Sequence, residues 1–172
     1  MSDRAGNPRE PTVTATDDER IRRATRRDLD RLAALWSALS EHHAAHDAIF
    51  APRPGAEAEI RRLLDATLRD ADAAIFVCEG ETGSRGYCVV RVDRAPPILM
   101  EVERAEITDL LVSEGERRRG IGRGLVVRAM RWVEDRGVAR CEVRVHSRNA
   151  QGQGFWRSLG FDSWLDVLHR RL

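Results

Sequence analysis

The sequence predicts one mixed α/β domain (α+β in some schemes), with a mostly antiparallel sheet flanked by helices. At 172 residues the chain is long enough for one hydrophobic core and short for two domains. Short apolar runs and amphipathic segments follow one another in the order β-α-α-β-β-β-α-β-α-β. One strand–helix–strand unit encloses a glycine-rich loop, as in a parallel crossover. We expect a loose polar tail over residues 1–19 and the domain over residues 20–172.

The first third of the domain predicts one strand and two helices. Residues 21–24 are short and extended, and Thr25 with Asp28 offers a helix start. Apolar residues then recur at helical spacing: Leu29, Leu32, Ala33, Leu35, Trp36 and Leu39. Prolines and a glycine break the chain at 51–55. A second helix is expected over 56–69, with one apolar side formed by Ile60, Leu63, Leu64 and Leu68.

The remaining elements build a sheet around one further pair of helices. Residues 73–78 predict a buried strand, 80–83 a turn and 87–92 its hairpin partner. Another strand is expected at 107–112, and the helix at 125–133 should end at Gly137. A strand with one polar face follows, in which Glu142 and Arg144 alternate with Cys141, Val143 and Val145. The pattern then predicts a last helix at 150–159 and a closing strand at 164–168.

Composition excludes several classes of function. A formal net charge of +1 excludes a strongly basic nucleic-acid-binding body. All 29 basic residues are arginine, so no lysine can form a Schiff base. The three cysteines lie in apolar runs without C-x-x-C spacing, as expected for core residues in a reducing compartment. No signal-like run and no stretch near the ~18 apolar residues of a membrane helix occurs, which predicts a cytoplasmic protein without membrane attachment.

Residues 116–124, Glu-Arg-Arg-Arg-Gly-Ile-Gly-Arg-Gly, have the layout of an anion-binding loop between a strand and a helix. A P-loop requires a lysine, which the chain lacks. A dinucleotide fingerprint requires a third glycine where Leu125 stands, and a tight turn, whereas these glycines begin eight residues past Val112. Glu142 could still mimic its ribose-binding acid, so that minor alternative stays open.

A third kind of loop fits the spacing. Arg117-x-x-Gly120-x-Gly122, preceded by the strand 107–112, resembles the acetyl-CoA signature of the GNAT N-acetyltransferase superfamily. Further along the chain, a second stretch resembles the downstream sequence element of the same family. It consists of Asn149, Phe155-Trp156 and Leu159-Gly160-Phe161. The resemblance covers roughly residues 21–172 and implies a GNAT-like fold that uses acetyl-CoA as a co-substrate.

The resemblance also implies how the acetyl donor binds. Backbone N–H groups from Arg117 to Gly122, extending to Gly124, would cradle the pyrophosphate, and the main chain of 110–112 would pair with the pantetheine arm as an added strand. Arg118, Arg119 and Arg123 are either phosphate ligands or solvated surface charges. The full implied set is Leu110, Leu111, Val112, Arg117, Arg118, Arg119, Gly120, Ile121, Gly122, Arg123, Gly124, Asn149 and Trp156.

Acetyl transfer to an amine requires a base, because an alkylamine is almost entirely protonated at neutral pH. Glu106 resembles the catalytic glutamate of GNAT histone acetyltransferases, which also lies 11 residues before the motif. The structural alternative is a glutamate paired with an arginine such as Arg104. Glu142 is the rival base, by its resemblance to ribosomal-protein N-terminal acetyltransferases. Asp109 ranks third, because strict alternation would place it on the opposite sheet face from Glu106.

Two further steps need donors. The backbone N–H of Leu111 or Val112 is the candidate for the oxyanion. Trp156 occupies the position where many GNAT enzymes carry a tyrosine that protonates the thiolate, and indole cannot serve as that acid. Trp156 is then a wall for the pantetheine or part of the core. Tyr87 could substitute only if the fold brings it close.

The acceptor side is less specific. His42 and His46 have the spacing of paired metal ligands, but no H-E-x-x-H signature occurs and we predict no metal. The resemblance would place this region beside the acceptor, making His46, Asp47 and Phe50 candidate contacts; a polar helix terminus is the alternative. We predict an acetyl-CoA-dependent N-acetyltransferase acting on a small-molecule or peptide amine in a ternary complex. A non-catalytic acyl-CoA-binding module is the alternative, and dimerisation through the terminal strand stays open.

Overall fold

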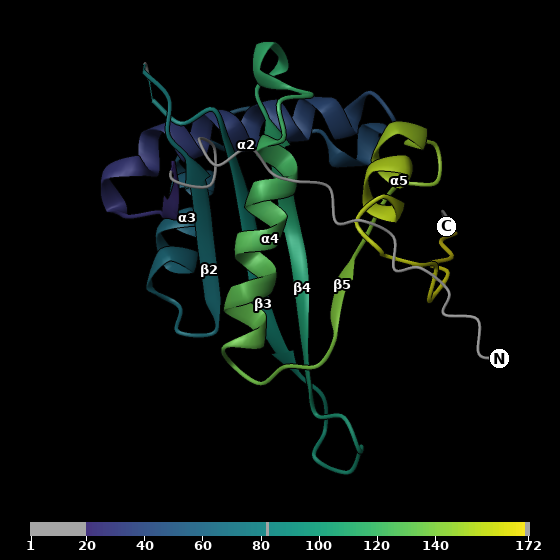
Figure 1. The fold of residues 1–172 in the computed structure, drawn as a ribbon. Helices are drawn as coiled ribbons and strands as arrows, with labels where there is room; N and C mark the ends of the chain where they lie inside the picture. Colours follow the sequence, from purple (N-terminus) through teal and green to yellow (C-terminus); the bar gives the residue numbers. More distant parts are fainter. Residues whose placement is uncertain (1–19, 82, 171–172) are drawn as a thin grey trace, which may run out of the picture.

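A sheet of five strands separates two helical layers in the computed structural model, which describes residues 20–81 and 83–170 (Figure 1). The predicted tail over residues 1–19 lies outside the described residues. The strands lie side by side in sequence order: β1 (Ile21–Arg23), β2 (Ala73–Cys78), β3 (Gly86–Arg94), β4 (Glu103–Val112) and β5 (Cys141–Val143). Neighbours pair antiparallel except β4 and β5, which are parallel, so the predicted crossover is confirmed.

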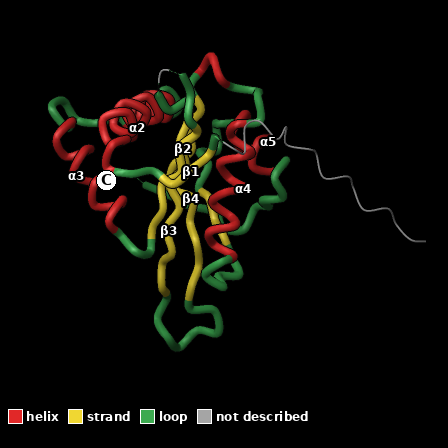
Figure 2. The backbone as a smooth tube through the Cα atoms, turned by 60° about the vertical axis from the view of Figure 1, so that its left-hand side comes forward, coloured by secondary structure: helices red, strands yellow, loops and turns green. Residues whose placement is uncertain are grey.

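Helices cover both faces of the sheet (Figure 2). One face packs on α2 (Leu29–Ala44) and α3 (Glu57–Arg69), and the other on α4 (Ile121–Glu134) and α5 (Ala150–Arg157). Three short 3-10 turns complete the structure: η1 (Arg26–Asp28), η2 (Ala48–Phe50) and η3 (Glu114–Glu116). No helix in the described ranges has both the length and the apolar character for crossing a membrane.

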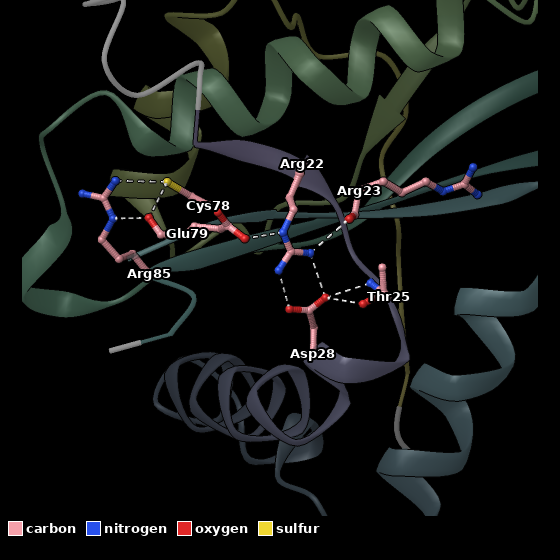
Figure 3. Close-up of polar contacts among 7 residues, drawn as sticks. All are labelled: Arg22, Arg23, Thr25, Asp28, Cys78, Glu79 and Arg85. Atoms are coloured by element: carbon pink, nitrogen blue, oxygen red, sulfur yellow. Dashed lines mark hydrogen bonds and ion pairs between the residues drawn. The ribbon is translucent and has the colours of Figure 1, made fainter. Parts of the chain in front are cut away.

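The start of α2 is fixed by a buried carboxylate (Figure 3). Asp28 accepts hydrogen bonds from the Thr25 backbone N–H (2.8 Å) and from both terminal nitrogens of Arg22 (2.8 and 2.9 Å). Arg22 also forms an ion pair with Glu79 on the far side of its guanidinium. Bidentate arginine–carboxylate pairing is geometrically specific, so it ties β1 to the turn that leads into α2.

A β-bulge in β4 changes which side chains share a sheet face. Val89 pairs with Asp109 but the next residue, Val90, pairs with Ile107, so Thr108 is an extra residue. Before the bulge, Ile107 faces the α4 core, which turns Glu106 toward the α2–α3 side. After it, Leu111 faces the α2–α3 core, and Asp109 therefore does too. The expectation that Glu106 and Asp109 lie on opposite faces is wrong because alternation breaks at Thr108.

β4 and β5 pair over only three positions, from Ala105–Cys141 to Ile107–Val143. β4 then continues to Val112 without β5, which bends away toward α5 in Figure 1. The pairing ends where the bulge begins. The second half of β4 therefore has one edge that β5 does not cover.

Two predictions about apolar segments are wrong. Residues 161–170 form no strand, and the expected strand at 164–168 leaves its apolar side chains 71–92% exposed: Trp164, Leu165, Val167 and Leu168. A strand needs a partner edge as well as a suitable composition. Leu63 of α3 is 55% exposed and does not join Ile60 and Leu64 in the core.

Candidate functional site

The glycine loop ends at the N-terminus of α4. Gly120 has φ +84° and Arg118 has φ +61°, so the chain turns sharply before Ile121. The N–H group of Gly124 donates to the Gly120 carbonyl (2.9 Å) as α4 begins. An α-helix leaves its first N–H groups without intrahelical acceptors, so those of residues 121–123 remain available to a ligand. The loop thus presents backbone donors at the positive end of a helix dipole.

The glycines have different roles. A Cβ on Gly122 would lie 3.4 Å from Cζ of Phe155, so this glycine faces the site. A Cβ on Gly124 would lie only 2.7 Å from Cδ1 of Ile21, in the layer between α4 and β1. Because its N–H is engaged within the helix, Gly124 is explained by packing, although the sequence placed it in the anion cradle.

The arginines of the loop hold its shape in part. Nε of Arg117 donates to the Val112 carbonyl (3.1 Å), which ties the loop to the end of β4. Arg119 pairs with Glu116 (3.3 Å), and Arg123 donates to the Ser158 carbonyl (3.4 Å). Arg118 and Arg119 are exposed beside the free N–H groups. Their side chains lie where they can reach a phosphate without crossing the core.

The uncovered edge of β4 lies next to this loop. Ser113 N–H donates to the Arg85 carbonyl (2.8 Å), in the direction of β3. Backbone groups along a strand alternate between its two edges, so Leu111 also points to β3 while Leu110 and Val112 point to the open edge. Leu111 contributes its side chain to the core instead.

Two of the candidate carboxylates are paired with arginines. Glu106, whose side chain is 13% exposed, forms an ion pair with Arg144 (3.2 Å) across to the segment that follows β5. Arg104, the partner suggested by the sequence, binds Glu142 instead. Arg140 binds the second oxygen of Glu142. Glu142 is therefore held on both oxygens by two arginines, whereas Glu106 has one exposed partner.

Asp109 is the carboxylate whose position the sequence did not reveal. Oδ1 accepts from the Tyr87 hydroxyl (3.3 Å) and Oδ2 from the Thr108 hydroxyl (2.7 Å). Burial raises the pKa of Asp109 above its usual range, and these hydrogen bonds oppose that rise. The fold does bring Tyr87 to this end of β4, on the same sheet face as Glu106 and Asp109.

A cluster of five aromatic rings lies where the end of α2 approaches the segment between β5 and α5. We call it the five-ring cluster. Ring centroids are 5.3–6.1 Å apart around a closed circuit of His42, His46, His146, Phe50 and His43. Burial and then neighbouring positive groups lower the pKa values of His42 and His43, although Asp109 opposes the shift at His43. His43 and Asp109 thus lie within electrostatic reach of each other, at the side of the cluster that faces β4.

An ion pair holds the cluster together. Asp47 accepts from the Ile49 backbone N–H (3.1 Å), which starts η2, and binds Arg148 (3.4 Å). Both segments that carry the rings are thus joined. Among the described residues, no group of three or more His, Cys, Asp or Glu side chains is arranged to hold a metal ion.

The helix α5 closes the other side. Asn149 caps it by accepting from the Gly152 N–H (2.8 Å), and its amide nitrogen forms no hydrogen bond within the described residues. Trp156 is 8% exposed and packs in the core between Phe155 and Phe161, with ring centroids 5.2 and 5.1 Å away. Of the two interpretations of Trp156, the core one fits. Phe155 is the ring beside Gly122.

The chain belongs to the acetyltransferase (GNAT) family, whose sequence profile matches residues 35–161. The fold is shared by solved structures. A mutant of a Bacillus halodurans protein superposes with a TM-score of 0.79 at 23% identity, covering 88% of this chain and 98% of that one. No curated protein matches the sequence.

Two structures with named activities have the same fold. A GCN5-related N-acetyltransferase from Ralstonia eutropha JMP134 superposes with a TM-score of 0.72 at 22% identity, covering 88% of this chain and 97% of that chain. The aminoglycoside N-acetyltransferase AAC(6')-Iy in complex with CoA superposes with a TM-score of 0.72 at 17% identity, covering 88% and 93%. At these identities the likeness concerns the fold.

Proposed function

We propose that the chain transfers the acetyl group of acetyl-CoA to a primary amine by direct attack in a ternary complex. One observation carries the proposal: the uncovered edge of β4 begins just beyond Ile107, one residue after Glu106, and runs past Asp109 to the N–H groups of the glycine loop. An extended thioester with a pyrophosphate at its far end fits this edge. The related aminoglycoside N-acetyltransferase with bound CoA supports the choice of donor.

The donor would be held by backbone groups. The pyrophosphate binds the N–H groups of residues 121–123, and the pantetheine amides pair with Leu110 and Val112 as an added strand. The exposed side chains of Arg118 and Arg119 supply positive charges to the phosphates. The Asn149 amide is free to donate to the same arm.

Glu106 is the proposed base. Freeing the lone pair of an alkylamine at pH 7 costs about 4 to 5 kcal/mol, so proton removal must be assisted. Within residues 20–81 and 83–170, Glu106 has one arginine partner, Arg144, whose side chain is 70% exposed and can swing away. Asp109 lies on the same face and is the second candidate, while Glu142 is disfavoured by its two arginines.

The remaining steps use the backbone and solvent. The N–H of Leu110 points to the open edge and is nearer to Glu106 and Asp109 than that of Val112, so it replaces the Leu111 or Val112 N–H as the candidate donor to the tetrahedral oxyanion. The Leu110 carbonyl and the Val112 N–H remain for the pantetheine amides. The amine nitrogen forms the new amide bond as the C–S bond breaks, and the electron pair leaves with the CoA sulfur. A thiolate is a stable leaving group near its pKa, so protonation by water suffices.

One observation favours a second function, a non-catalytic acyl-CoA-binding module. The side chains nearest Gly122 are the apolar Phe155 and Val112, and the chain's single tyrosine is buried on the opposite sheet face. The test measures CoA release from acetyl-CoA across a panel of amines, with thermal unfolding in parallel. Stabilisation by acetyl-CoA together with turnover supports the enzyme; stabilisation without turnover on any amine supports the module.

A further inference from the structure

Four of the chain's five histidines gather in the five-ring cluster, together with Phe50. The rings come from α2, from the turn after it, from η2 and from the segment after β5, so only the fold assembles them. His46 and His146 are nearly parallel, with 13° between their planes, and Phe50 stands edge-on to His146. Phe50 is 45% exposed, so an apolar ring edge is open to solvent. Such a surface can pack against a flat ligand.

The cluster also contains an unsatisfied polar atom. Nε2 of His46 is buried and has no hydrogen-bond partner among the described residues. Buried nitrogen atoms are nearly always hydrogen-bonded, so an exception needs a reason. A ligand seated on the cluster could supply the missing partner.

Asp47 and the candidate carboxylates of β4 and β5 already have partners. Asp47 binds Arg148, Glu106 binds Arg144, and Glu142 binds both Arg104 and Arg140. Asp109 is buried and hydrogen-bonded by Tyr87 and Thr108. A polycationic acceptor would find little uncompensated negative charge here and would lose its hydration in return.

We infer that the acceptor is a primary monoamine with an aromatic body, whose ring packs on the five-ring cluster while its amino group points toward Glu106 and Asp109. This inference rests on the proposed function and specifies its substrate class. Ring-to-ring packing supplies affinity that an alkyl chain of equal length lacks. Burial lowers the pKa of His42 and of His43, so at neutral pH these two imidazoles add no positive charge that would repel the amine.

The test compares matched amines on the full chain. 2-Phenylethylamine, 2-cyclohexylethylamine and kanamycin are offered with acetyl-CoA, and kcat and KM are measured for each. We expect kcat/KM for 2-phenylethylamine to exceed that for its saturated analogue several-fold, and to exceed that for kanamycin by roughly tenfold or more. Equal values for the aromatic and saturated amines, or a preference for kanamycin, would overturn the inference while leaving the acetyltransferase intact.

A variant pair tests the surface itself. Phe50→Ala should raise KM for 2-phenylethylamine about three- to tenfold and leave KM for the cyclohexyl analogue nearly unchanged. Ile49→Ala is the matched control, because Ile49 lies on the same turn, is 68% exposed and belongs to no ring pair. Equal effects of Phe50→Ala on both amines would contradict a ring-specific contact.

Binding separates this inference from the proposed chemistry. Calorimetry of 2-phenylethylamine with the CoA-loaded protein reports the ring contact without turnover. Binding that Phe50→Ala weakens, with no acetylation of any amine, supports the ring site and rejects the proposed function. Absence of binding and of turnover rejects both.

Discussion

The Tyr87 hydroxyl donates a hydrogen bond of 3.3 Å to Oδ1 of Asp109 from the neighbouring strand. Tyr87 is completely buried and stands opposite Leu111, two residues beyond Asp109. The contact exists because the bulge at Thr108 returns Asp109 to the face that Tyr87 shares. Burial raises the pKa of Asp109, and the tyrosine limits the rise by stabilising the charged carboxylate.

Tyr87→Phe should therefore shift the acidic limb of the rate profile. The variant removes a hydrogen bond to the ionised form, so the pKa of Asp109 rises further. If ionised Asp109 takes part in the reaction, the acidic limb of kcat/KM moves to higher pH while the rate on the plateau changes little. Tyr87→Phe is close to isosteric, and circular dichroism checks that the fold is retained. An unmoved limb would show that Asp109 is not the group that the profile reports.

Glu106→Gln should reduce kcat at least 100-fold at neutral pH and leave stabilisation by acetyl-CoA unchanged. The amide keeps the size of the side chain and loses only its basicity. Glu142→Gln is the matched control on the neighbouring strand, aligned with Glu106 in the parallel register. Its carboxylate is held by two arginines, so we expect a smaller loss of activity than for Glu106. The reverse order of the two effects would move the base to Glu142.

Local sequence signals predicted most of the framework. β2 occupies residues 73–78, as expected, because an uninterrupted apolar run between turn residues specifies a buried strand without outside help. The glycine loop could also be predicted from the sequence, because the spacing of its glycines indicates a tight turn of the backbone before a helix. The helix at Ile121–Glu134 begins four residues earlier than predicted, because the glycines that disfavour a helix interior are tolerated in its first turn.

Contacts between segments that are distant in the sequence could not be predicted in the same way. The bulge at Thr108 depends on how β4 pairs with β3, which no single segment encodes. Residues 164–168 have the composition of a strand but no partner edge. His146 lies 100 residues from His46, so their stacking follows only from the folded chain. Much of the candidate acceptor site depends on such contacts.

Gly122 and Gly124 should respond differently to substitution. Gly122→Glu places a bulky anion against Phe155 beside the free N–H groups, and we expect it to abolish thermal stabilisation by acetyl-CoA. Gly124→Ala meets only Ile21, so it should preserve that stabilisation. In an Ile21→Val background, which removes Cδ1, Gly124→Ala should raise the free energy of unfolding by about 0.5 to 1 kcal/mol through better helix propensity. Retained acetyl-CoA stabilisation in Gly122→Glu would remove the loop from the donor site.

Asp28→Asn should lower the free energy of unfolding at neutral pH, because the Asp28 carboxylate binds Arg22 through both oxygens. The Arg22 hydrogen bonds lower its pKa from 3.8 to about 2. With a folded-state pKa below the unfolded value, the stabilisation is fully present above about pH 4 and is lost as pH falls through about 2. We expect a loss of about 1 to 2 kcal/mol at pH 7, after allowance for the partial exposure of Arg22.

Glu79→Gln, which removes the exposed partner of the same arginine, should cost less. Urea unfolding at pH 7 and pH 3 measures both variants, and the difference between wild type and Asp28→Asn should shrink at the lower pH. A difference independent of pH would show that Asp28 acts through its uncharged capping bonds alone.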